Sequence, residues 1–252
     1  MAQHGHSEAC CNVPPAQVNY KEKGHYIAVD GMRTYKTGPS DATSAILVVF
    51  DIFGYCPQTL QGADILAYSG DSSHQYQVYM PDFFHGKPAE SWWVPPDTPE
   101  KGQKLGEFIK GPASAANNVP KIPSLVGEIT KKSGGVIQKW GALGLCWGGK
   151  IIVLSSGIDT VFTAVSTAHP SAVDPKDAEA LTVPICMLPS KDEPADAVAA
   201  FTEALKVPAH VETFTDQVHG WMAARADLGN ARAREEYERG YKTLLEFFHK
   251  YL

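Results

Sequence analysis

The sequence predicts an α/β protein with a mostly parallel sheet and helices on both faces. Apolar runs rich in β-branched residues alternate along the chain with segments of helical periodicity, as in repeated strand–helix units. One run, SAILVVF at Ser44–Phe50, is apolar throughout, which is typical of a central strand covered on both faces. With 252 residues and a hydrophobic fraction of 44%, the chain can bury the core of one such domain.

Composition narrows the class of protein. A formal net charge of −6 argues against a nucleic-acid binder, and the sequence has no apolar run of the ~18 residues that a membrane span needs. Its start has neither the basic nor the apolar region of a secretory signal. Five cysteines, of which Cys10 and Cys11 are adjacent, do not suggest a disulfide framework. We therefore expect a cytoplasmic, reduced protein, a monomer or homodimer, with no membrane or nucleic-acid partner.

Residues 1–16 are interpreted as a flexible lead-in to a single domain over residues 17–252. Four potential metal ligands occur in this lead-in: His4, His6, Cys10 and Cys11. Nothing fixes their spacing in a turn or a helix, so we favour a tail with one or two docked side chains and expect no metal.

The first half of the domain is predicted to run from an edge hairpin to a central strand, a helix and a second buried strand. Asp30-Gly31 is a typical hairpin turn, so the flanking segments 25–30 and 32–36 should pair antiparallel. Pro57 suits the first position of the helix that follows the central strand, and the next buried strand covers Gln77–Met80.

A long loop of aromatic and polar residues follows that strand, with the sequence PDFFHGKPAESWWVPPDTPEK. Its glycine and prolines keep it irregular, but its Phe and Trp side chains are too apolar to lie fully in water. The loop could pack on the domain or form the wall of a binding pocket. We favour the pocket slightly, because ligands bind at the carboxyl ends of parallel strands.

The second half continues the alternation of helices and strands. The predicted elements are helices over about 99–110 and 119–133, strands at Val161–Thr167, Val183–Leu188 and Ala209–Phe214, a helix near 194–205, and a last helix at Asn230–Leu252. The connection between the strands that end at Thr167 and begin at Val183 is short, so we expect no cap domain there.

The stretch Val136–Lys150, VIQKWGALGLCWGGK, contains the first functional signal. An apolar run ends at Leu145 and a helix is predicted from Gly148, with Cys146 at the joint. The segment GLCWG has the form of a nucleophile elbow, with cysteine in place of the usual serine. Such an elbow holds the sulfur above the sheet edge at a helix N-terminus, whose dipole favours thiolate. The alternative is a structural buried cysteine between chance glycines.

Chain order then predicts a catalytic triad. Cys146 follows one strand, Asp192 comes two strands later and His219 follows the last strand, which is the order in an α/β-hydrolase. In this arrangement His219 exchanges the thiol proton, and Asp192 fixes the imidazole tautomer and offsets its charge.

Three other residues compete for roles near the triad. Asp196 is expected inside a helix, and Asp216 is only three residues from the catalytic histidine, so both are weaker candidates for the acid. His169 also ends a strand, and we expect its ring to bond to the backbone or, second, to line the pocket.

An oxyanion hole needs two main-chain donors. One candidate is the N–H of Trp147, and the other comes from Ile52 or Phe53 in the loop after the central strand. Asp51 precedes them at the exit of a buried strand, where it either faces the site or caps a turn.

Five segments together resemble the dienelactone hydrolase family, in particular its fungal branch: VVFDIFG, YMPDFFHGKP, GALGLCWGG, SKDEPAD and VHGW. The resemblance covers nearly the whole chain from about Tyr20. It implies one α/β-hydrolase domain without a cap and a triad of Cys146, Asp192 and His219. It also implies hydrolysis of lactones and esters, notably enol-lactones, without a cofactor.

The resemblance extends to substrate binding, with differences. Bacterial members have a glutamate before the IFG segment, where this chain has the shorter Asp51, and they bind the substrate carboxylate with arginines. Here His85 and Lys87 stand in the corresponding loop and Arg225 lies a little further along than expected, so the substrate need not be the same. The remaining residues that we place in the pocket are Phe53, Trp92 and Trp221.

A cysteine nucleophile also favours acidic leaving groups. A thiolate, with a free pKa of about 8.5, leaves a tetrahedral intermediate more readily than an alkoxide or an amine, which favours enol-lactones over peptides. Two other classes remain open. A lyase, isomerase or cyclase of secondary metabolism would use the same pocket without taking up water, and a non-catalytic ligand receptor would not need an intact triad.

Overall fold

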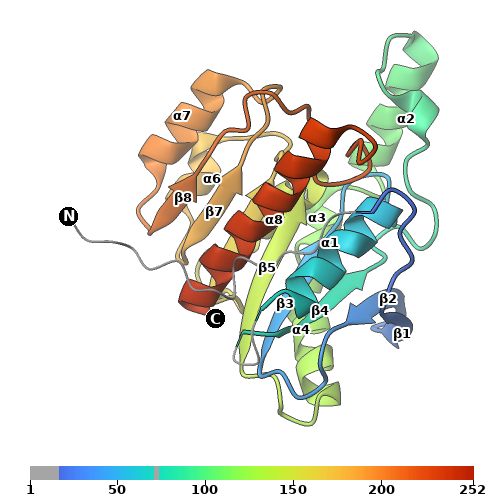
Figure 1. The fold of residues 1–252 in the computed structure, drawn as a ribbon. Helices are drawn as coiled ribbons and strands as arrows, with labels where there is room; N and C mark the ends of the chain where they lie inside the picture. Colours follow the sequence, from blue (N-terminus) through green and yellow to red (C-terminus); the bar gives the residue numbers. More distant parts are fainter. Residues whose placement is uncertain (1–16, 71–73) are drawn as a thin grey trace.

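The computed structural model describes residues 17–70 and 74–252, whose strands form one eight-stranded sheet with helices on both faces (Figure 1). The lead-in expected over residues 1–16, and any metal site within it, lie outside the described residues. The strand order is β1-β2-β4-β3-β5-β6-β7-β8. Within this sheet, β1–β2 and β2–β4 pair antiparallel and every other neighbouring pair is parallel, so the predicted fold class is confirmed.

The strands follow the sequence pattern closely. They are β1 (His25–Val29), β2 (Met32–Thr37), β3 (Ser44–Val49), β4 (Tyr76–Pro81), β5 (Lys139–Leu145), β6 (Ala164–Ala168), β7 (Ile185–Leu188) and β8 (Ala209–Val211). The hairpin turn at Asp30-Gly31 forms with positive φ at both residues, 48° and 73°.

Strands β6, β7 and β8 are shorter than predicted, and β7 begins at Ile185 instead of Val183. β6 begins after a local turn in which the Phe162 N–H donates to Thr160 Oγ1 at 3.3 Å. β8 ends at Val211, and beyond it the pairing continues only as an isolated bridge between Ser190 and Phe214.

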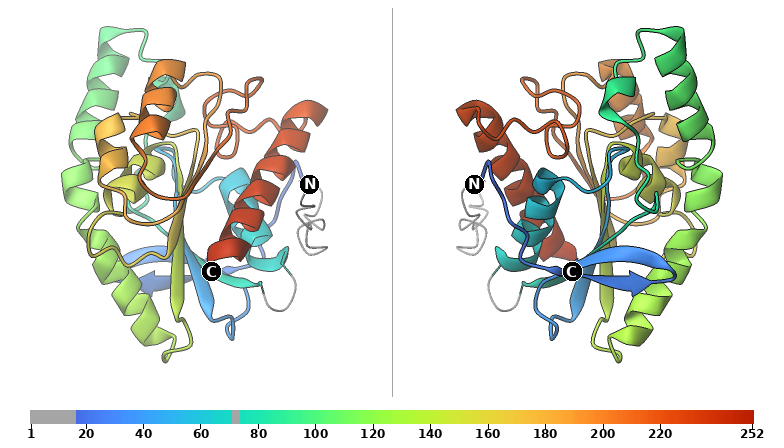
Figure 2. Two further views of the ribbon diagram at one scale, coloured as in Figure 1. Left: turned by 90° about the vertical axis from the view of Figure 1, so that its left-hand side faces the viewer. Right: turned by 90° about the vertical axis from the view of Figure 1, so that its right-hand side faces the viewer.

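The helices divide between the two faces of the sheet. They are α1 (Pro57–Tyr68), α2 (Pro99–Lys110), α3 (Ala115–Asn118), α4 (Lys121–Lys132), α5 (Trp147–Leu154), α6 (Pro175–Glu179), α7 (Ala195–Ala204) and α8 (Ala231–Tyr251), with a 3-10 turn η2 (Ser91–Trp93) in the long loop. Figure 2 shows α1 and α8 on one face and α2, α4, α5 and α6 on the other. The sequence pattern did not predict α6, which lies in the connection between β6 and β7. Within the described residues, no helix combines the length and apolar character that crossing a bilayer requires.

The register of the parallel strands brings their carboxyl ends to one level. Val49 of β3 pairs with Gly144 of β5, Leu145 pairs with Ala168 of β6, and Ala168 pairs with Leu188 of β7. The loops that follow these four strands therefore leave the sheet at the same edge, where ligands bind in open α/β sheets.

Candidate active site

Cys146 lies in a sharp turn between β5 and α5. Its backbone has φ 54° and ψ −113°, a conformation that residues with a side chain rarely adopt. Hydrogen bonds on both sides hold this conformation: the Cys146 N–H donates to the Ala168 carbonyl at 3.1 Å, and the Cys146 carbonyl accepts the Ser171 N–H at 3.1 Å. The backbone thus makes the turn that a nucleophile elbow requires.

The glycines on either side allow the close packing behind this turn. A Cβ atom on Gly148 would lie 1.9 Å from the Val49 carbonyl oxygen, and one on Gly144 would lie 2.3 Å from the Gly148 carbonyl oxygen. Only glycine at these positions lets α5 start directly against β3 and β5. The elbow is therefore fixed by main-chain contact with the sheet.

His219 lies in the loop between β8 and α8 and joins the thiol to a buried carboxylate. Its Nδ1 atom lies 2.6 Å from Oε1 of Glu193, whose side chain is only 3% exposed. The other Glu193 oxygen accepts the N–H of Ser190. Burial by itself lowers the pKa of His219, but hydrogen bonds with the Cys146 thiol and with Glu193 outweigh it and raise that pKa to about 10. The ring is therefore protonated at neutral pH.

The expected contact between Asp192 and the imidazole is corrected by this geometry. Asp192 is exposed, and its Oδ2 accepts the main-chain N–H of His219 at 2.8 Å. The Asp192 N–H donates to Ser190 Oγ at 3.2 Å, so residues 190–193 form a turn in which neighbouring side chains face different ways. The longer Glu193 side chain reaches inward from this turn to the ring. Sequence analysis missed Glu193 because two adjacent acids satisfy the same chain order.

The two weaker candidates for the acid are occupied elsewhere. Asp196 lies in α7 as expected, and its Oδ1 accepts the Ala197 N–H at 2.9 Å. Asp216 is exposed and forms an ion pair with Arg232 at 2.7 Å.

Two main-chain N–H groups are placed as candidate oxyanion donors. Trp147 is the first residue of α5, where amides have no partner within the helix. Its indole N–H donates to the Ala113 carbonyl at 2.7 Å and fixes the residue. The N–H of Phe53 donates to Asp51 Oδ1 at 2.8 Å, which leaves Ile52 as the second candidate.

Asp51 links the two loops on either side of the thiol. Besides capping the turn at Phe53, it accepts the Ala224 N–H at its Oδ2, 3.2 Å away, from the loop that holds His219. Burial raises the pKa of Asp51 to about 6, although both N–H donors and the charge of His219 oppose the shift. Asp51 therefore caps the turn, and its buried carboxylate also lies within the field of the His219 charge.

The predicted basic pocket residues occupy two separate hollows. His85 and Lys87 line a groove of about 520 Å³ whose other walls are Phe83, Phe84, Gly111, Pro112, Asn117 and Lys121. Sequence analysis missed Lys121 and Asn117, because they follow Lys87 by 34 and 30 residues and lie outside the long loop. The rings of Phe83 and Phe84 contact that of Trp147, with centroids 5.8 and 4.8 Å apart, so one aromatic layer connects this groove with the elbow. Arg225 instead lines a hollow of about 320 Å³ beside the His219 loop.

The predicted aromatic pocket residues also lie apart. Trp92 is 44% exposed, donates its indole N–H to Glu90 at 2.9 Å, and packs under Lys104. Trp221 is buried and stacked on Phe214 at 4.2 Å, where it lines the same hollow as Arg225. Phe53 is half-buried next to the candidate oxyanion donors.

His169 follows β6 and packs against His219. Its ring centroid lies 5.3 Å from that of His219, at an interplanar angle of 69°. The expected hydrogen bond to the backbone is not formed with any other residue, and the ring is fully buried.

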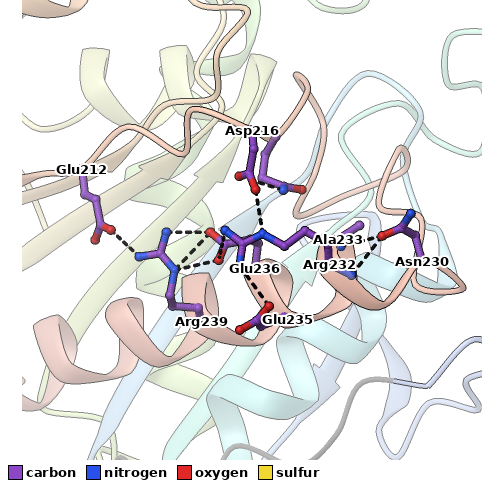
Figure 3. A network of polar contacts seen from close by, with 9 residues as sticks. Glu212, Asp216, Asn230, Arg232, Ala233, Glu235, Glu236 and Arg239 are labelled. Atoms are coloured by element: carbon purple, nitrogen blue, oxygen red, sulfur yellow. Dashed lines mark hydrogen bonds and ion pairs between the residues drawn. The ribbon is translucent and has the colours of Figure 1, made fainter.

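A network of ion pairs anchors the His219 loop to α8 (Figure 3). Glu236, which is 2% exposed, pairs with Arg232 at 3.0 Å and with Arg239 at 2.6 Å. Arg232 also pairs with Asp216 in the loop, and Arg239 with Glu212 before it. No group of three or more His, Cys, Asp or Glu side chains within residues 17–70 and 74–252 is arranged to hold a metal ion.

A parallel sheet covered on both faces, a cysteine in an elbow and a histidine bound to a buried carboxylate define an α/β-hydrolase fold. The chain belongs to the dienelactone hydrolase family, whose sequence model matches residues 32–252. It is 36% identical over 251 residues to the AIM2 family protein C30D10.14 of Schizosaccharomyces pombe, covering 95% of this chain and 98% of that protein.

Two further comparisons agree with this family. The carboxymethylenebutenolidase homolog of Homo sapiens is 26% identical over 251 residues, covering 94% of each chain. The crystal structure of a putative dienelactone hydrolase from Klebsiella pneumoniae superposes with a TM-score of 0.67 at 18% identity, covering 90% of this chain and 98% of that one. This chain is therefore similar to both of these proteins over nearly its full length. The protein is a hydrolase of this family.

Proposed function

We propose that the protein hydrolyses lactones or esters, with Cys146 as the nucleophile, His219 as base and acid, and Glu193 as the group that orients the histidine. The observation that supports this most is the 2.6 Å contact of Glu193 with a ring that also bonds to the Cys146 thiol. Relatives named as carboxymethylenebutenolidase homologs favour the opening of a lactone ring.

The reaction follows from these positions. The Cys146 sulfur attacks the carbonyl carbon, and the negative oxygen accepts the N–H groups of Trp147 and Ile52. The intermediate collapses by breaking the bond to the leaving-group oxygen, which takes a proton from His219 and leaves an acyl thioester. His219 then removes a proton from water, whose oxygen attacks the thioester, and the acid and the thiol are released.

An acidic substrate with an enol leaving group suits the site. When the other leaving group is a strongly basic alkoxide, the tetrahedral intermediate expels the thiolate instead and returns to substrate, whereas an enolate leaves readily. Lys87, His85 and Lys121 line one groove and provide hydrogen-bond donors for a carboxylate. In this role they would take the place of the arginines of bacterial family members.

We place this chemistry in a single domain over residues 17–252 in a reducing compartment. Cys56, Cys146 and Cys186 are free thiols, and the nucleophile must remain so.

Mass spectrometry of the intact protein tests the proposal. After brief reaction with an enol-lactone or aryl ester, wild type and Cys56→Ala should gain one acyl group, and Cys146→Ala should gain none. In water enriched with oxygen-18, the released acid should contain one labelled oxygen. Hydrolysis by Cys146→Ala at the wild-type rate would contradict the assignment, and turnover without labelled product would identify a lyase or isomerase.

A further inference from the structure

The backbone at His169 is held in an unusual conformation next to the elbow. His169 has a φ of 39°, in the left-handed region that side chains other than glycine rarely enter. Its N–H donates to the Leu188 carbonyl at 2.8 Å. Ala168, which precedes it, and Ser171, two residues after it, bond to the N–H and carbonyl of Cys146. The same hydrogen bonds that shape the elbow therefore place the His169 side chain.

The imidazole of His169 is poorly suited to stability alone. It is fully buried, and neither ring nitrogen has a hydrogen-bond partner outside its own residue. A buried polar atom without a partner lowers the stability of the fold, and an apolar ring of similar size would avoid that penalty. A histidine in this position therefore needs a reason other than packing.

The neighbour that this ring faces is His219. The two ring centroids are 5.3 Å apart, and the rings are inclined at 69°. His219 already bonds to Glu193 through Nδ1 and to the Cys146 thiol, so His169 adjoins a third side of the ring. The other ionisable groups near the pair are Asp51, whose pKa is lowered by the charge of His219, and Arg225, whose charge lowers the pKa of His169.

The two histidines carry different charges. Burial holds the pKa of His169 well below its usual value, and the positive charges of His219 and Arg225 act in the same direction. His169 therefore stays neutral beside the protonated His219. A neutral imidazole has a large dipole, and no competing hydrogen bond prevents its lone pair from facing the positive ring.

We propose that His169 is a positioning residue for His219, and that its neutral dipole stabilises the protonated His219 ring between Glu193 and Cys146. The proposal rests on the proposed function, since it assigns His219 as the base.

Two substitutions separate this role from packing. His169→Phe keeps a buried ring but removes the dipole, and His169→Gln keeps a neutral polar group without the ring. For His169→Phe we expect a melting temperature at or above that of wild type. The pH midpoint for alkylation of Cys146 by iodoacetamide should rise by about 0.5–1 pH unit, and kcat should fall about 3–10-fold with KM changed less than about twofold. His169→Gln should lie closer to wild type in both the midpoint and kcat.

A wild-type midpoint and kcat in His169→Phe would overturn the proposal, because His169 would then serve packing only. Equal impairment of His169→Gln and His169→Phe would also overturn it, because ring shape would then matter and not polarity. Alkylation needs no turnover. If the midpoint shifts as expected but no ester is hydrolysed by wild type, the proposed function fails and the positioning role stands.

Discussion

Oε1 of Glu193 lies 2.6 Å from Nδ1 of His219, in a position where the carboxylate can fix the ring and offset its charge. The adjacent Asp192 bonds to the main-chain N–H of the same histidine at 2.8 Å. Glu193 thus bonds to the ring of His219, and the adjacent Asp192 bonds to its backbone.

Substituting each acid should have very different effects. Glu193→Gln removes the charge opposite the imidazolium and favours the wrong tautomer, so kcat should fall about 10²–10⁴-fold. Asp192→Asn keeps an oxygen that can accept the His219 N–H, so kcat should fall less than about fivefold. Steady-state kinetics on one aryl ester, with circular dichroism to verify folding, provide the measurement.

The result distinguishes the two acids directly. A larger loss in Asp192→Asn than in Glu193→Gln would restore Asp192 as the third member of the triad.

The sequence predicts the elbow at Cys146 but not which acid contacts the ring of His219, and the reason is physical. Cys146 is marked by glycines that the backbone needs at fixed spacing, and such constraints are visible in one chain. The choice between Asp192 and Glu193 depends on how a turn directs two adjacent side chains, and neither composition nor periodicity encodes that direction.

The contacts of His219 with Cys146 and Glu193 should make stability depend on alkaline pH. Against the effect of burial, they raise the pKa of His219 from 6.5 to about 10 in the folded protein. These contacts therefore stabilise the fold fully below about pH 6.5, and this stabilisation is lost as the pH rises through about 10. Between about pH 7 and 10.5, the free energy of unfolding in urea should fall by at least ~1 kcal/mol more in wild type than in His219→Ala. Parallel pH profiles for the two proteins would show that the histidine is not protonated in the fold.

The ion-pair network around Glu236 should contribute measurably to stability. Arg239→Ala removes one of the two cations that neutralise a carboxylate only 2% exposed, and it also uncovers the ring of Phe214. We expect a loss of about 1–3 kcal/mol in the free energy of unfolding. Glu236→Gln in the same chain should recover part of that loss, since the unpaired charge is then absent.

Arg234→Ala is the matched control, because Arg234 lies on the same helix and takes part in none of these ion pairs. An equal loss in both variants would attribute the effect to α8 as a helix and not to the ion pairs.

The groove that contains Lys87 should distinguish acidic substrates from neutral ones. A charge-assisted contact contributes roughly 1.5–3 kcal/mol, so Lys87→Ala should raise KM about 10–100-fold for an acidic lactone and leave a neutral analogue nearly unchanged. Arg225→Ala should change KM less, because Arg225 lines the other hollow. Equal effects of Lys87→Ala on both substrates, or none on either, would mean that the groove recognises shape.

The predicted basic residues lie in two separate hollows for a structural reason. His85 and Lys87 follow β4 on one side of the aromatic layer formed with Trp147, whereas Arg225 packs beside Gly220 in the histidine loop. The sequence places all three near strand ends but does not state on which side of Trp147 each one lies.

The contact between Gly148 and Val49 limits how this protein can diverge. The distance of 1.9 Å that a Cβ atom would face at Gly148 fixes the helix to the sheet through main-chain atoms alone. Exchange of the side chain at residue 146 leaves that contact intact, whereas any side chain at residue 148 would push the start of α5 away from β3. The side chain in the elbow can therefore change by a single substitution without moving the backbone that carries it, while Gly148 admits no such change.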